Sequence, residues 1–152
     1  MLELKRILLV EDSANDVALS MAALEEINLA NEVVVVGDGQ QALDFLRRQG
    51  AYAGRTDGHP AVVLLDLKLP KVDGLEVLAQ LKNDPELRTI PVVMLTSSRE
   101  EQDLTRSYGL GVNAYVVKPV AFPDFVTALR ELGLFWAVVN QPPPGTQTRR
   151  GQ

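Results

Sequence analysis

The chain lacks cysteine altogether and has a single histidine, His59. Without cysteine it can form neither a disulfide nor a thiolate metal site, and cysteine nucleophiles are excluded. One histidine cannot build a site of several histidine ligands. Because His59 stands in a glycine-rich segment directly before Pro60, we predict a solvated loop residue rather than a ligand.

Positive charge and long apolar runs are also scarce. The 15 Lys and Arg residues are outnumbered by 20 Asp and Glu, and the net charge is −5. Nucleic-acid binding is therefore disfavoured, because it needs a basic face. No apolar stretch is long enough to span a bilayer, and acidic residues near the start break the pattern of a signal peptide. We expect a cytoplasmic protein that binds neither nucleic acid nor membrane.

Short apolar runs alternate with segments of helical periodicity along the chain. This alternation is typical of βαβ units and a parallel sheet. The expected strands are Ile7–Val10, Glu32–Val36, Ala61–Leu65, Ile90–Leu95 and Ala114–Val117. The expected helices lie near Asn15–Ile27, Gln40–Arg48, Leu75–Lys82, Glu100–Tyr108 and Pro123–Leu132. We predict one α/β domain with a doubly wound sheet of five parallel strands and five helices. Ser13, followed by Asp16, is a capping signal for the first helix.

Two segments do not fit this minimal plan. Residues 50–60 form a glycine-rich loop that is longer than most helix-to-strand loops. Residues 141–152 are proline-rich and then polar, which predicts a disordered tail. We therefore assign 1–140 to the folded domain, with an apolar extension at 133–140.

Polar side chains stand at the ends of four expected strands. Glu11 and Asp12 follow one strand, Asp66 follows another, and Thr96 and Lys118 follow two more. Carboxyl ends of parallel strands meet at one edge of an open sheet, so these side chains should converge. Clustered carboxylates need a cation, and Mg²⁺ is a hard ion that prefers oxygen ligands. One carboxylate would then remain as a nucleophile toward phosphorus.

With these residues placed, the chain resembles the receiver domains of two-component response regulators over about residues 5 to 133. The motifs that carry the resemblance are Glu11-Asp12, Asp66 with Pro70 and Asp73-Gly74, Thr96-Ser97 and Lys118-Pro119. The resemblance implies a flavodoxin-like sheet of order 2-1-3-4-5. It also implies a protein that accepts a phosphoryl group from the phosphohistidine of a histidine kinase, rather than an enzyme. Such a protein promotes its own phosphorylation and dephosphorylation.

The resemblance also assigns roles to the acidic residues. Asp66 would be the phosphoacceptor. Mg²⁺ would be bound by Asp12, by Asp66, by Glu11 directly or through water, and by the backbone carbonyl of Lys68. Two structural alternatives stay open: Asp66 would only cap the turn after its strand, and Glu11 with Asp12 would only serve the first helix N-terminus.

Three further residues would act on the phosphoryl group or respond to it. By resemblance, Lys118 would contact the phosphoryl oxygens, and Thr96 would hydrogen-bond to them. Tyr115 would be the switch aromatic that turns inward when Thr96 moves. The Lys118–Pro119 peptide bond would be cis. The structural alternatives are an ion pair from Lys118 to Asp66 and ordinary strand packing for the other two.

A narrower resemblance concerns the 50–60 loop and the pair Phe135-Trp136. Both are similar to single-domain regulators that partner bacterial phytochrome histidine kinases. We predict a homodimer surface formed by Leu132, Phe135, Trp136 and Val138, since exposed apolar patches mark interfaces. The alternative is a last helical turn packed on the sheet edge.

Several functions compete for this sequence. The first is a signalling switch without a DNA-binding output domain, whose output is a contact with an unknown downstream protein. The alternatives are a phosphorelay intermediate that passes the phosphoryl group to a phosphotransfer protein, and a pseudo-receiver that is never phosphorylated. A phosphatase of the haloacid-dehalogenase type needs a second aspartate where Lys68 stands. A nucleotide-binding module is disfavoured because residues 11–15 contain acids and no glycine.

Overall fold

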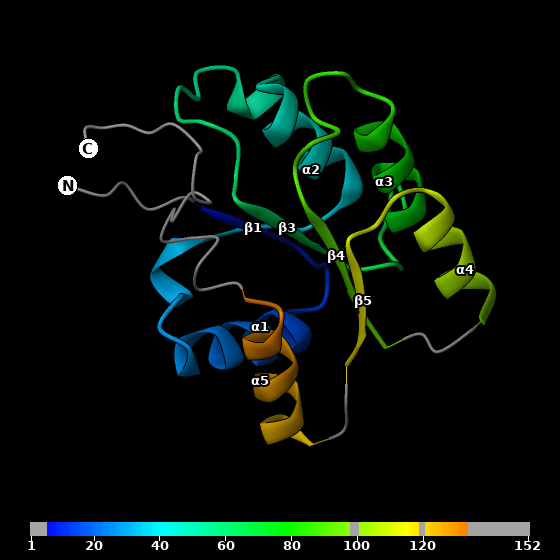
Figure 1. Cartoon of the computed structure of the whole chain (residues 1–152). Helices are drawn as coiled ribbons and strands as arrows, with labels where there is room; N and C mark the ends of the chain where they lie inside the picture. Colours follow the sequence, from blue (N-terminus) through cyan, green and yellow to red (C-terminus); the bar gives the residue numbers. More distant parts are fainter. Residues whose placement is uncertain (1–5, 98–100, 119–120, 134–152) are drawn as a thin grey trace, which may run out of the picture.

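In the computed structural model, residues 6–97, 101–118 and 121–133 are described. Their five strands form one parallel sheet of order β2-β1-β3-β4-β5, as the resemblance implied (Figure 1). The strands are β1 (Ile7–Val10), β2 (Val33–Val36), β3 (Val62–Leu65), β4 (Val92–Thr96) and β5 (Ala114–Val117). The predicted fold class is therefore confirmed.

Five α-helices in the described part of the chain connect and follow the strands. They are α1 (Ala14–Glu26), α2 (Gly39–Arg47), α3 (Gly74–Lys82), α4 (Glu101–Gly109) and α5 (Phe122–Glu131). Single 3-10 turns occur at Ala30–Glu32 and Gly50–Tyr52. Helices α1 and α5 cover one face of the sheet, and α2 and α3 cover the other, with α4 beside α3 (Figure 1). Each α-helix and strand begins and ends within two residues of its expected position.

The hydrophobic core has two halves because the sheet is covered on both sides. In β1, Leu8 and Val10 pack toward α2 and α3, whereas Ile7 and Leu9 pack toward α1 and α5. This division follows from the pleat, which points successive side chains to opposite faces. The continuous apolar strands seen in the sequence are what a sheet buried on both faces requires.

The long loop before β3 is held against α2 by Arg55. Its Nε donates a 3.1 Å hydrogen bond to the backbone carbonyl of Phe45, and its guanidinium carbon lies 4.1 Å from the centre of the Phe45 ring. Its Nη1 pairs with the Asp57 carboxylate at 2.8 Å. His59 lies in this loop; its side chain is 28% exposed, and its Nε2 lies 3.8 Å from Glu86. This contact places the end of the loop beside the segment after α3.

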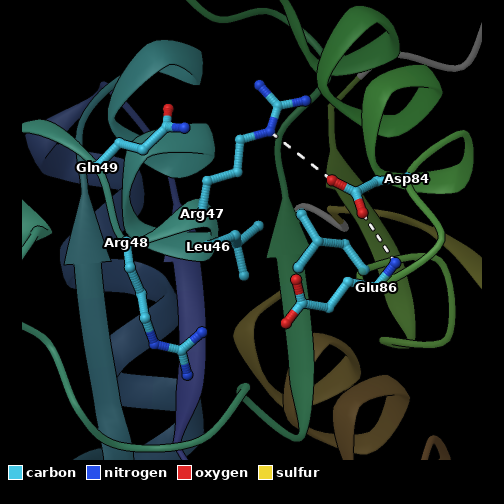
Figure 2. A pocket seen from close by; sticks show the side chains of 7 residues that line it. Leu46, Arg47, Arg48, Gln49, Asp84 and Glu86 are labelled. Atoms are coloured by element: carbon cyan, nitrogen blue, oxygen red, sulfur yellow. Dashed lines mark hydrogen bonds and ion pairs between the residues drawn. The ribbon is translucent and has the colours of Figure 1, made fainter.

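A pocket of about 300 Å³ lies between the end of α2 and the segment after α3 (Figure 2). Its charged side chains each have a polar partner, and two of these partners, Asp57 and His59, lie outside the pocket lining. Arg47 Nε lies 4.0 Å from Asp84, and Asp84 accepts a 2.8 Å hydrogen bond from the backbone of Glu86. The pocket lies at the amino ends of the strands, because α2 runs back from the carboxyl end of β2. It is therefore at the opposite edge of the sheet from the predicted site.

Parts of the sequence predictions lie outside the described residues. Most of the 133–140 extension, the 141–152 tail, and Phe135, Trp136 and Val138 of the predicted dimer surface are among them. Leu132 is described: it caps the end of α5 and packs, partly buried, against the core on the α1 and α5 side. Within the described ranges, we find no helix with the length and apolar character that crossing a membrane requires.

Candidate functional site

The three predicted acidic residues lie together. Glu11, Asp12 and Asp66 each offer a carboxylate oxygen within 4.8 Å of the others. Glu11 and Asp66 are buried, with 3% and 8% of their surfaces exposed, whereas Asp12 is exposed. Carboxylate oxygens at this separation are the hard ligands that Mg²⁺ prefers. The residues present therefore fit a divalent cation.

The sheet itself brings these carboxylates together. Strands β1 and β3 are parallel neighbours, with Val10 opposite Leu65, so the residues that follow each strand meet at one edge. The Asp66 amide donates a 3.1 Å hydrogen bond to the carbonyl of Val10. The Glu11 amide donates a bond of the same length to the carbonyl of Val36 on β2. Both acidic residues therefore continue the hydrogen bonding of the sheet.

The loop after Asp66 returns tightly onto it through Gly74. A Cβ atom at this position would lie 2.2 Å from the carbonyl oxygen of Asp66 and 2.8 Å from the Cα of Leu67. The Gly74 amide donates to the carbonyl of Leu67 at 2.9 Å, and Asp73 caps α3 by accepting from Glu76 at 2.9 Å. The Asp-Gly pair therefore combines a helix cap with a position that only glycine fits.

The same loop is also fastened to the start of α2. Asp38 caps α2 by accepting from the amide of Gln41 at 2.7 Å, and its other oxygen lies 3.5 Å from Lys71 Nζ. Lys71 has a φ of 68°, a left-handed conformation that is uncommon outside glycine. Sequence analysis missed this contact. The local signal is the Asp38-Gly39 pair before α2, which indicates a helix cap but not the partner of the second carboxylate oxygen.

Lys118 reaches the site from the end of β5. Its Nζ donates a 2.7 Å hydrogen bond to Glu11 Oε1 and lies 3.3 Å from Asp16 Oδ2. The lysine side chain is 6% exposed. The alternative considered from the sequence was an ion pair between Lys118 and Asp66. The structure instead pairs Lys118 with Glu11 and Asp16. Asp16 was read only as part of a capping signal, which is confirmed: its amide donates to Ser13 Oγ at 3.3 Å.

Burial and charge shift the titration of this pair. Burial raises the pKa of Glu11 to about 7; the hydrogen bond from Lys118 opposes the shift, and the nearby charge of Asp66 adds to it. Burial alone would lower the pKa of Lys118. The hydrogen bond with Glu11 and the negative charges of Glu11, Asp66 and Asp16 outweigh burial, and the pKa of Lys118 is raised. The ammonium group is therefore charged at neutral pH.

Thr96 and Tyr115 belong to the two strands beyond β3. Thr96 ends β4 and is 1% exposed, and its carbonyl accepts a 2.7 Å hydrogen bond from the amide of Lys118. Tyr115 lies opposite Met94 and packs, partly buried, on the α2 and α3 side of the core. Lys68 is exposed in the loop after Asp66. The predicted cis bond of Lys118–Pro119 lies outside the described residues, because Pro119 is not among them.

Several named proteins are similar to this chain. The probable methanogenesis regulatory protein FilR2 of Methanothrix harundinacea is 43% identical over 137 residues, which cover 90% of this chain and 86% of that protein. The response regulator Rcp1 of Synechocystis sp. is 42% identical over 132 residues, which cover 87% of this chain and 88% of that protein. Both similarities span most of each protein.

Solved structures are similar over the whole domain. The bacteriophytochrome response regulator RtBRR is 63% identical with a TM-score of 0.78, over 94% of this chain and 86% of that one. The phosphorylated cyanobacterial phytochrome response regulator RcpA is 41% identical with a TM-score of 0.80, over 93% of this chain and 99% of that one. The Mn²⁺-bound form of Rcp1 is 41% identical with a TM-score of 0.78, over 91% of this chain and 99% of that one.

The family comparison gives the same result as the fold and the residues at the edge of the sheet. The profile of the response regulator receiver domain matches residues 7–130, which include all five strands and nearly all of α5. The chain belongs to the family of response regulator receiver domains.

Proposed function

We propose that this chain is a phosphorylatable signalling switch in which Asp66 accepts a phosphoryl group from the phosphohistidine of a histidine kinase. The observation that carries the proposal is the meeting of Asp66 with Glu11, Asp12 and Lys118 at one edge of the sheet. Membership of the receiver family and the phosphorylated structure of the relative RcpA support it.

The proposed transfer is a direct displacement at phosphorus. A carboxylate oxygen of Asp66 attacks the phosphorus atom, an O–P bond forms, and the P–N bond to the histidine breaks, with its electron pair going to the imidazole nitrogen. Lys118 supplies a fixed positive charge for the phosphoryl oxygens. Mg²⁺, when bound, neutralises charge on those oxygens and orients them. Asp12, Asp66, Glu11 and the backbone carbonyl of Lys68 would hold it, and the Mn²⁺-bound structure of Rcp1 supports a divalent ion here.

The proposed switch runs through Thr96 and Tyr115. The Thr96 hydroxyl would donate a hydrogen bond to the phosphoryl group, and Tyr115 would follow by turning inward. Such a change is a shift between two existing arrangements, driven by the contacts that the phosphoryl group adds to one of them. The support is their position on adjacent strands, with Thr96 at the same edge as Lys118.

We further propose a bacterial phytochrome histidine kinase as the partner. The support is the similarity to RtBRR and RcpA, whose names carry the phytochrome link. To test this, phosphoryl transfer to the chain is measured from an autophosphorylated phytochrome kinase and, in parallel, from an unrelated histidine kinase. Transfer at least tenfold faster from the phytochrome kinase is expected. Equal rates would contradict this choice of partner while leaving phosphorylation of Asp66 intact.

A homodimer formed by Leu132, Phe135, Trp136 and Val138 remains part of the proposal. Its support is the apolar sequence, since only Leu132 is described. The output would then be a protein contact, or onward transfer to a phosphotransfer protein. Sedimentation over a hundredfold concentration range tests the dimer, and a monomeric mass throughout would contradict it.

A further inference from the structure

One carboxylate at the site stands outside the group that fits a metal. Asp16 lies in the first turn of α1, and its Oδ2 is 3.3 Å from the Nζ of Lys118. The carboxylates placed to hold a metal ion are those of Glu11, Asp12 and Asp66, and Asp16 is not among them. The side chain of Asp16 is 40% exposed, whereas that of Lys118 is 6% exposed. Asp16 therefore contacts the buried lysine from the solvent side.

Glu11 cannot serve Lys118 and a divalent cation equally well. Its Oε1 accepts from Lys118 at 2.7 Å, and its Oε2 accepts from the amide of Ser13 at 3.2 Å. Both oxygens are thus engaged. An ammonium group and Mg²⁺ on the same carboxylate would repel each other strongly in so buried a place. When the cation takes Glu11, Lys118 needs another negative partner to offset its burial.

We propose, on the basis of the proposed function, that Asp16 is a positioning residue that keeps Lys118 paired on the α1 side when a divalent cation occupies Glu11. Asp16 then competes with the phosphoryl group for the same ammonium. It acts through Lys118 and touches neither the metal nor the phosphorus atom.

This role predicts effects of opposite sign for two ligands. Without the Asp16 carboxylate, Lys118 loses its second ion pair and stays on Glu11, so Mg²⁺ binds more weakly. At saturating Mg²⁺ the same loss removes a competitor, so a phosphoryl mimic gains the lysine more easily and binds more tightly. A partly exposed ion pair accounts for about two- to fivefold in each affinity. A variant with a merely damaged site would bind both ligands more weakly.

The test uses calorimetric titration of the full chain with Mg²⁺ alone and then with beryllofluoride, a phosphoryl mimic, at saturating Mg²⁺. Asp16→Asn should weaken Mg²⁺ about two- to fivefold and tighten beryllofluoride by a similar factor. Asp16→Glu should restore both affinities toward wild type. Glu26→Gln, at the exposed far end of α1, is the matched control for the loss of one negative charge and should change neither affinity.

The Lys118→Met background separates this role from general electrostatics. There, adding Asp16→Asn should no longer tighten beryllofluoride, because the shared lysine is gone. If Asp16→Asn alone weakens the binding of both Mg²⁺ and beryllofluoride, or changes neither affinity, the positioning role is overturned. The proposed function still stands in that case, provided that the wild type binds both ligands. A wild type that binds neither ligand would overturn both.

Discussion

The Nζ of Lys118 lies 2.7 Å from Oε1 of Glu11, and both side chains are almost fully buried. This pair joins the ends of β5 and β1, which are separated in the sheet by β3 and β4. A buried pair of this kind ties ionisation, metal binding and stability together.

The first prediction concerns pH. Because the pKa of Glu11 is raised from 4.5 to about 7 by burial, the folded chain holds its proton where the unfolded chain releases it. The free energy of unfolding of the metal-free protein should therefore fall by on the order of 1–3 kcal/mol as pH rises through this window. Urea denaturation in a chelator at several pH values measures it.

The control for this prediction is Glu11→Gln, which keeps a hydrogen-bond acceptor for Lys118 but cannot ionise. Its stability should lack this component of the pH dependence. Added Mg²⁺ favours the ionised carboxylate, so stabilisation of the wild type by Mg²⁺ should grow as pH rises toward 8. Identical pH profiles for wild type and Glu11→Gln would show that Glu11 does not titrate as the structure indicates.

The second prediction concerns the close return of the chain at Gly74. Gly74→Ala would place a methyl group 2.2 Å from the carbonyl oxygen of Asp66, so the loop or the strand end must shift. We expect a loss of about 1–3 kcal/mol in the free energy of unfolding and slower phosphorylation of Asp66. Gly109→Ala at the end of α4 is the matched control, because its Cβ meets nothing within 4 Å. Equal stability of the two variants would refute the steric account.

The third prediction concerns Arg55, which fastens the 50–60 loop to α2. Arg55→Ala removes the hydrogen bond to Phe45, the ring contact and the ion pair to Asp57. We expect a loss of about 1–3 kcal/mol in the free energy of unfolding and faster amide hydrogen exchange in the loop. Phosphorylation should be unaffected, since the loop contributes none of the residues at the carboxylate site. Arg88→Ala, at an exposed position, is the control variant. If Arg55→Ala slows phosphorylation and Arg88→Ala does not, the loop is linked to the site and the prediction is wrong.

The fourth prediction separates chemistry from switching. Thr96→Ala should still accept a phosphoryl group on Asp66, because the nucleophile and the cation ligands are untouched. It should lack the change at Tyr115, because the hydroxyl that responds to the phosphoryl group is missing. Nuclear magnetic resonance of the Tyr115 ring, with and without beryllofluoride and Mg²⁺, measures the change. Thr96→Ser should behave as wild type, and an unaltered response in Thr96→Ala would contradict the switch.

The sheet and the acidic cluster were predictable because they follow from local patterns. The apolar runs of β1 and β3 mark strands covered on both faces, and a residue that ends one parallel strand lies beside the residue that ends the next. Asp66 and Glu11 are neighbours once the strands are recognised and β1 is placed beside β3. The order of the strands came from the family resemblance, since periodicity alone does not fix it.

The remaining contacts depend on packing between distant segments, which no local pattern encodes. Asp16 meets Lys118 only because α1 starts at the edge where β5 ends. Lys71 reaches Asp38 because the loop after β3 turns toward α2 in a left-handed conformation. His59 is partly covered because the loop before β3 folds back. Each contact joins residues whose separation in sequence gives no signal of closeness.

The most direct test of phosphorylation at Asp66 is intact mass spectrometry after incubation with acetyl phosphate and Mg²⁺. The wild type should gain a single phosphoryl group. Asp66→Asn, and the wild type in excess chelator, should gain none. Two results would contradict the role of Asp66 as phosphoacceptor. One is a phosphoryl group on Asp66→Asn. The other is no adduct after rapid quenching on a wild type that is shown separately to bind Mg²⁺.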